Sequence, residues 1–282
     1  MSIYVYQLGL VSIYLIIVIG ICAVKFIKPL NELLQYGKTS NIPKESHSNT
    51  TFHRLINWIS SNLVVPKSWF THFYITLFTL SSLIFFGSYT NTSTTSNPVK
   101  FKNLTLIHRL LWIQSVRRLS ECLFVSKFSP TSKMNISHYL IGVGHYVLVS
   151  LATYLGLSTY APSFDAKLVN YSYVDLMLMF CFGVLSILQF SAHYHLSSLV
   201  KYTVPSFKHV ASPHYLYEIL IYTIFAIYSA KNGLDLTSIT FMSSWLFVVC
   251  NLTISSLETY KYYSEKFKDA FKLKWAIFPG LI

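Results

Sequence analysis

The sequence predicts an all-α integral membrane protein with seven transmembrane helices, and three observations support this fold class. Hydrophobic residues make up 53% of the 282 residues, whereas charged residues make up only 11%. The mean hydropathy is +0.47. A soluble domain carries charged side chains at about a quarter of its positions, so most of this surface must face lipid. Apolar runs of about twenty residues, long enough to cross a bilayer as helices, recur along the chain.

These apolar runs define seven candidate spans in a single multi-span domain that covers residues 1–282. They lie near residues 3–27, 69–90, 104–125, 138–158, 172–191, 214–230 and 237–257. The first run is too long for the apolar region of a signal peptide, so we expect an uncleaved span. The third run is interrupted by charged residues. The sixth and seventh runs are joined at 231–233, where only a tight hairpin fits.

The distribution of basic residues predicts how the spans are oriented. With seven spans, fifteen of the 22 lysines and arginines fall in the first, third and fifth loops and the C-terminal tail, on one side of the membrane. Four fall on the opposite side, and three lie within the third span. Because basic residues are retained in the cytosol, we predict a lumenal N-terminus and a cytosolic C-terminus. An even number of spans would remove this asymmetry.

Composition also argues against several kinds of partner. The net charge is +12, but the cations lie between apolar runs and form no dense tract with interleaved aromatic residues, so we expect no nucleic acid. The four cysteines are far apart and lack metal-ligand spacing, so we expect no metal. Membrane lipids are the partners that this composition favours.

The third span carries polar residues on one helical face. Gln114, Arg117, Arg118 and Glu121 recur at spacings of three and four residues, and Arg117 could pair with Glu121. Ionisable groups at membrane depth usually face the interior of a bundle. This face could be an interhelical ion pair that only holds the bundle together, or it could bind an anionic ligand.

Two further polar pairs lie near span ends. Gln189 and His193 are one turn apart at the end of the fifth span, where histidines are usually interfacial anchors. His214 and Glu218 are one turn apart at the start of the sixth span. They offer a hydrogen-bond donor beside an acceptor, as a carboxamide ligand requires, although a mutual His–Glu bond would be the simpler arrangement.

The tail at 258–269 is basic and aromatic. Its composition is typical of an amphipathic segment that lies on anionic lipid. The same segment could close over a phosphorylated cofactor.

Taken in order, several short motifs resemble the steroid 5α-reductase family. They lie at 34–39, 65–74, 117–121 (RRxxE), 213–218 (PHYxxE), 263–267 and 276–279. The versions at 65–74 and 213–218 are similar to those of the polyprenol reductase branch, particularly its yeast members. The resemblance runs almost end to end, and the part from about 104 to 282 resembles the family's catalytic region.

The resemblance implies a seven-helix enzyme of the endoplasmic reticulum membrane that uses NADPH. Such an enzyme saturates a carbon–carbon double bond conjugated to a carbonyl. In this branch the bond lies in the α-isoprene unit of a long-chain polyprenoid, on the route to the dolichol that supports protein N-glycosylation. The alternatives left open are reduction of another enone lipid, such as a 3-oxo-Δ4 steroid, and a non-enzymatic multi-span transporter or receptor.

The resemblance also implies roles for individual residues. Glu218, with His214 in place of an Asn, would hold the nicotinamide carboxamide. The other cofactor contacts would come from Tyr263, Gln189 and His193. For the phosphates of NADPH we expect cationic partners at the cytosolic side, namely Arg117, Arg118, Lys201 and lysines of the tail.

The chemistry adds an expectation about the substrate. Hydride attacks an alkene readily only when the developing charge moves onto an oxygen, so we expect polyprenal rather than polyprenol as the direct substrate. Tyr74 and Tyr36 are the candidate donors to that oxygen.

Three departures from the family leave the proton donor open. Trp58 and Ile59 occupy the spacing of a Gln–Glu pair in the steroid branch, Gln114 replaces a His, and Tyr260 replaces another.

Overall fold

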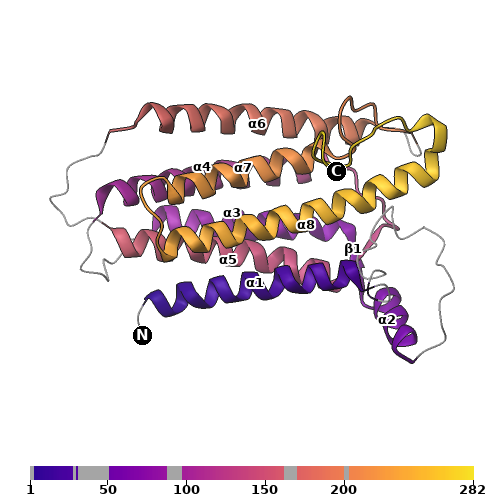
Figure 1. The fold of residues 1–282 in the computed structure, drawn as a ribbon, viewed down its shortest axis with the longest axis horizontal. Helices are drawn as coiled ribbons and strands as arrows, with labels where there is room; N and C mark the ends of the chain where they lie inside the picture. The colour runs from indigo at the N-terminus through magenta and orange to yellow at the C-terminus, as the bar shows by residue number, and fades with distance from the viewer. Residues whose placement is uncertain (1–2, 28–29, 31–50, 88–96, 162–169, 200–202) are drawn as a thin grey trace.

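A computed structural model describes residues 3–27, 30, 51–87, 97–161, 170–199 and 203–282. The expectations placed on Tyr36 and Lys201 fall outside these residues. In the described part, long helices lie side by side in one elongated bundle (Figure 1). These helices are α1 (Ile3–Phe26), α3 (Phe70–Phe86), α4 (Pro98–Phe124), α5 (Ile136–Tyr160), α6 (Tyr173–Ser198), α7 (Pro213–Ala230) and α8 (Leu236–Phe267).

Each long helix coincides with one of the seven apolar runs. By length and composition, α1, α3 with the turn before it, α5, α6 and α8 are able to cross a membrane. Helices α4 and α7 correspond to the third and sixth runs, which contain polar and charged residues. The described structure therefore has five candidate spans, together with two more polar helices that pack within the same bundle.

The shorter elements lie at one end of the bundle, which we call the α2 end (Figure 1). They are the helix α2 (Thr51–Asn62), the strands β1 (Val64–Pro66) and β2 (Lys133–Asn135), and the 3-10 turns η3 (Lys67–Trp69) and η4 (Lys268–Ala270). The strands pair antiparallel, with Val65 opposite Met134. Asn135 then caps α5 by accepting from Ser137 N at 2.9 Å. The short sheet thus ties the start of α3 to the start of α5.

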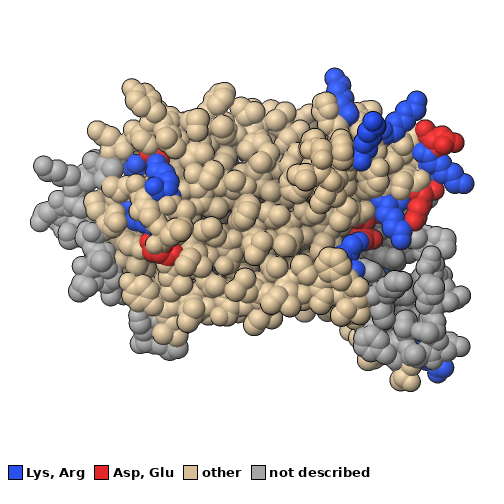
Figure 2. Space-filling view, in the orientation of Figure 1, with Lys and Arg blue, Asp and Glu red and all other residues tan. Residues whose placement is uncertain are grey.

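The opposite end of the bundle is held by charged groups. Asp175 in the first turn of α6 is fully buried and pairs with Lys102 of α4 at 2.7 Å and with Lys231 after α7. Lys100 pairs with Asp235, the N-cap of α8, at 2.7 Å. Figure 2 shows the charged side chains on one face gathered near the two ends, with a wide band of other residues between them. This distribution suits a membrane-embedded middle.

The tail differs from the expected separate segment. Helix α8 continues through Phe267, and Glu258 within it pairs with Lys25 of α1. The residues that follow fold back onto the chain before α7: Ala211 N donates to Trp275 O at 3.0 Å. Residues 258–267 are therefore the last turns of α8, in which Tyr263 packs against Phe267, and their expected contact with anionic lipid stays a prediction.

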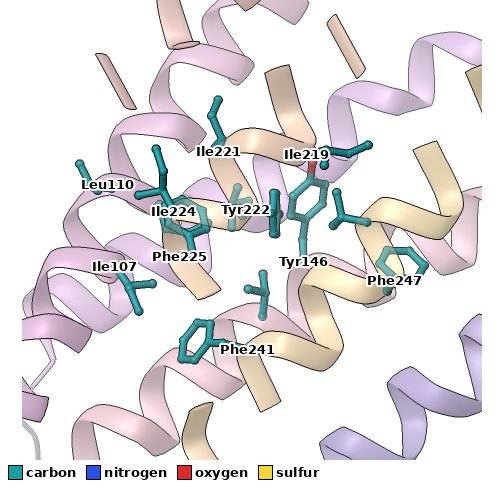
Figure 3. Packing of buried hydrophobic residues seen from close by; sticks show 14 of the residues in the cluster. Ile107, Leu110, Tyr146, Ile219, Ile221, Tyr222, Ile224, Phe225, Phe241 and Phe247 are labelled. Atoms are coloured by element: carbon teal, nitrogen blue, oxygen red, sulfur yellow. The ribbon is translucent and has the colours of Figure 1, made fainter. Parts of the chain in front are cut away.

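The centre of the bundle is a packed apolar core. Figure 3 shows side chains of α4, α7 and α8 meeting there, among them Ile107, Phe225 and Phe241. Helices α3 and α5 approach closely at Gly142, because a Cβ at this position would lie 2.4 Å from the ring of Phe73. The same approach places the Phe73 ring beside the cavity described below.

We predict that Asp175→Ala destabilises the bundle, because two lysines would lose their buried partner. The free energy of unfolding should fall by roughly 3 kcal/mol, measured by detergent denaturation of the purified protein. Lys261→Ala breaks only the exposed 3.8 Å pair with Glu265 and should change stability by less than about 0.5 kcal/mol. Equal effects of the two substitutions would contradict this assignment.

Candidate functional site

A cavity of about 520 Å³ lies within the bundle and reaches toward the α2 end. Its volume is typical of a small-molecule or cofactor pocket. Six of the residues singled out from the sequence line it, namely Tyr74, Arg118, Gln189, His193, His214 and Glu218. They come from α3, α4, α6 and α7, so the fold brings together groups that are far apart in the sequence.

The polar network behind the cavity wall is centred on Glu121 of α4. This carboxylate is only 2% exposed and pairs with both Arg117 and Arg118. The predicted Arg117–Glu121 pair is therefore confirmed. Arg117 also reaches beyond its own helix, because it donates to Gln189 of α6. One carboxylate thus holds two guanidinium groups inside the bundle, and one of these groups bridges two helices.

Glu218 of α7 closes the same network from the other side. Its Oε2 accepts from Gln114 Nε2 at 3.0 Å and from Gln189 Nε2 at 2.5 Å. Both amide oxygens accept from Arg117, so the orientation of each amide is fixed by its partners. In the part of the chain that the structure describes, no hydrogen bond reaches Oε1 of Glu218, which leaves a carboxylate acceptor at the cavity.

Arg118 connects this wall to Tyr74. Its Nη2 donates to the Tyr74 hydroxyl at 2.6 Å, and the guanidinium carbon lies 4.6 Å from the centre of the phenol ring. A guanidinium has no acceptor, so the Tyr74 oxygen accepts this bond and its own proton stays available to another acceptor. Tyr74 is therefore held as a hydrogen-bond donor at the cavity wall.

His193 contacts two opposite charges through one nitrogen. Its Nδ1 lies 2.8 Å from Arg118 Nη1 and 2.7 Å from Glu121 Oε2. The contact with Arg118 requires an unprotonated Nδ1, whereas the contact with Glu121 requires an N–H. Only one of the two can be a hydrogen bond in a given tautomer, and in either case His193 is fixed against the ion-pair cluster.

A second polar group lines the cavity that sequence reasoning missed. His145 of α5 places Nε2 2.9 Å from the hydroxyl of Tyr222 on α7, and Tyr146 lies beside them. A single histidine in an apolar run is usually a packing residue, so no local pattern pointed to His145. The available signal was helical spacing, because Tyr222 follows Glu218 by four residues and shares its face.

Tyr263 does not join the other site residues. It is 5% exposed and packs against Tyr262, Phe267 and Phe271, away from the residues that line the cavity. Its expected cofactor contact stays a prediction.

Comparison with known proteins gives a consistent result. The sequence profile of the 3-oxo-5-alpha-steroid 4-dehydrogenase family matches residues 132–282. The polyprenal reductase of Saccharomyces cerevisiae is 34% identical over 94% of this chain and 92% of its own length. The polyprenal reductase of Danio rerio is 28% identical over 84% of this chain and 82% of its own, and that of Homo sapiens 26% identical over 89% and 85%.

Proposed function

The chain belongs to the 3-oxo-5-alpha-steroid 4-dehydrogenase family of oxidoreductases, and we propose that it reduces the α-isoprene double bond of polyprenal with NADPH. The product would lie on the route to dolichol in the endoplasmic reticulum and so support protein N-glycosylation. The observation that carries this proposal is the cavity itself. It sets the Glu218 carboxylate and the Tyr74 hydroxyl within one apolar chamber.

The residues present fit the nicotinamide end of NADPH. Glu218 is fixed at Oε2 by two glutamines, and its Oε1 is free to accept from the N–H of a carboxamide. His214 lines the cavity one turn earlier on the same helix. When bound, NADPH would supply the hydride that adds to the β-carbon of the conjugated aldehyde.

Tyr74 is our candidate for the group that binds the aldehyde oxygen. Negative charge develops on that oxygen as the double bond is reduced, and a fixed donor stabilises it. The hydrogen bond from Arg118 polarises the phenol, and the nearby guanidinium adds a positive potential. Tyr36 remains a second candidate.

The contacts of the two arginines favour a different role from phosphate binding. Arg117 is engaged by Glu121, Gln114 and Gln189, and Arg118 by Glu121 and Tyr74. We propose that both orient the site. The phosphates would then meet cations nearer the α2 end, such as the tail lysines, while the role expected of Lys201 lies outside the described residues and stays a prediction.

The apolar remainder of the cavity suits a long hydrocarbon. Residues of α1 and α8, including Ile21 and Leu252, line it. Gly20 also lines it, and among the described residues no atom beyond its chain neighbours and its own helix backbone lies within 4 Å of a Cβ built there. We propose that the polyprenoid tail leaves the cavity sideways past Gly20, while the aldehyde stays near Tyr74.

The membrane arrangement that we propose keeps all seven helices as spans. The two polar helices α4 and α7 would cross in the interior, shielded by the five apolar ones. The α2 end would be cytosolic, which agrees with the excess of basic residues expected on that side and gives NADPH access to the site.

Glycosylation reporters test this topology. A reporter fused before Ile3 should be glycosylated, and one fused after Ile282 should not, because only the first would reach the lumen. A glycosylated C-terminal reporter would contradict the seven-span arrangement.

Glu218→Gln tests the cofactor role. The new amide oxygen can still accept from Gln114 and Gln189, but the other atom becomes a donor and no longer accepts from the carboxamide. The KM for NADPH should rise about 10- to 100-fold, the effect of one charge-assisted hydrogen bond. Glu265→Gln, at an exposed position, is the control. Reduced accumulation of Glu218→Gln protein with unchanged kinetics would instead indicate a structural role.

A comparison of substrates, each assayed separately, tests whether polyprenal is the preferred one. Membranes with NADPH should reduce polyprenal faster than polyprenol or a 3-oxo-Δ4 steroid, because only the enal combines a conjugated carbonyl with a long chain. Faster turnover of the steroid would favour the enone-steroid alternative that the family description suggests.

Gly20→Trp tests the sideways exit. It should slow reduction of long-chain polyprenal by more than about tenfold, as expected when a bulky side chain misplaces the substrate. The rate with a ten-carbon enal should stay unchanged. Gly9→Trp, on the same helix but away from the cavity, is the matched control. An equal loss for both chain lengths would contradict the exit past Gly20.

A further inference from the structure

We propose that Tyr222 delivers the proton to the α-carbon of the substrate, with His145 behind it as a positioning residue. This inference rests on the proposed reduction of an enal. Saturation of the double bond requires a proton at the α-carbon as well as a hydride at the β-carbon. The groups of the ion-pair cluster do not offer one, because Arg117, Arg118 and Glu121 hold one another as charged partners.

The position of Tyr222 on α7 suits this task. It lies one helical turn after Glu218, about 6 Å along the axis, and both side chains line the cavity. If Glu218 holds the carboxamide, Tyr222 lies one turn deeper from the α2 end, where the reacting bond has to lie against the nicotinamide. Figure 3 shows Tyr222 with Tyr146 and Phe247 among the side chains of this region.

The side chains of Tyr222 and His145 are largely shielded from bulk solvent. Tyr222 is 3% exposed, and its ring centre lies 5.4 Å from that of Phe225. His145 is 6% exposed, with the ring of Phe247 at 4.8 Å. A proton needed here has to come from a side chain rather than from bulk solvent.

The hydrogen bonds order the proton on Tyr222. The hydroxyl of Tyr14 lies 3.4 Å from both Nδ1 and the backbone oxygen of His145, and in the arrangement that we propose it donates to Nδ1. A neutral imidazole with an accepting Nδ1 carries its proton on Nε2, which then donates to the Tyr222 oxygen at 2.9 Å. In this tautomer the Tyr222 oxygen accepts from His145, so its own proton is available to a group in the cavity that Tyr222 lines.

The step balances in atoms and electrons. After hydride addition, the substrate is an enolate whose oxygen is held by Tyr74. Its electron pair forms a C–H bond at the α-carbon as the O–H bond of Tyr222 breaks. The Nε2 proton of His145 passes to the Tyr222 oxygen, and Nδ1 takes the proton of Tyr14. After each turnover, one proton from solvent returns to the Tyr14 oxygen and resets this proton relay.

The three other tyrosines that line the cavity fit this role less well, and Tyr215 lies three residues before Glu218, nearer the α2 end than Tyr222. Tyr74 accepts from Arg118 and is committed to the aldehyde oxygen. Tyr146 lines the cavity, but in the described part of the chain no histidine donates to its hydroxyl, so nothing there would return a proton to it.

Reduction of a ten-carbon enal in D₂O with the purified full chain and NADPH tests the proposal. Tyr222→Phe should lower kcat by about 100-fold, as removal of a general acid does, while the KM for NADPH stays within about twofold. Tyr228→Phe is the matched control, because this tyrosine is buried on the same helix and donates to Asp175 O at 2.6 Å, away from the cavity. His145→Asn should also lower kcat, but by less than Tyr222→Phe does.

The configuration of the deuterium at the α-carbon is a second measurement, which a purely structural defect would not change. Wild-type enzyme should place deuterium there in one configuration, whereas residual product from Tyr222→Phe should carry it in both. A wild-type product labelled in both configurations would overturn the proposal even if the variant fails to accumulate. So would a Tyr222→Phe enzyme with kcat within threefold of wild type, or a larger loss in Tyr146→Phe. Wild-type enzyme that reduces no enal would instead overturn the proposed function.

Discussion

Compensation of buried charge is the constraint on which the rest of this structure depends. Arg117, Arg118 and Glu121 lie on one helix of a bundle whose surface, on the face that Figure 2 shows, carries charged side chains only near its two ends. An unpaired charge at such a depth would cost several kcal/mol, so each must find a partner. The partners are supplied across helices, through Gln189 of α6 and through Gln114 to Glu218 of α7. The contacts that satisfy the charges also bring α4, α6 and α7 together.

The helices divide into two kinds for the same reason. Helices α4 and α7 are the two more polar helices, and the five more apolar helices pack against them and against one another. The apolar helices supply the hydrocarbon walls, and α3, α5 and α6 also add polar groups through Tyr74, His145, and Gln189 with His193. A cavity built in this way is polar on one side and apolar on the other. That asymmetry suits a ligand with a reactive polar head and a long apolar tail.

The sequence predicted the helices better than it predicted the site. Hydropathy located all seven long helices, because lipid and core both select apolar residues over whole turns. Spacing within one helix also predicted the Arg117–Glu121 pair. Contacts between helices were outside its reach, since nothing local indicates that His145 faces Tyr222 or that two glutamines hold Glu218. The length of α8 was missed because its last turns are basic and aromatic rather than apolar.

The exit that we propose past Gly20 would also affect which chain lengths the enzyme accepts. A closed pocket measures its ligand, whereas a chamber that lets the tail pass outward senses only the first few isoprene units. On the proposed function, the enzyme would treat all chain lengths alike once the chamber is filled. The enzymes that build the chains would then set the distribution of lengths among the saturated products, and this reductase would not change it.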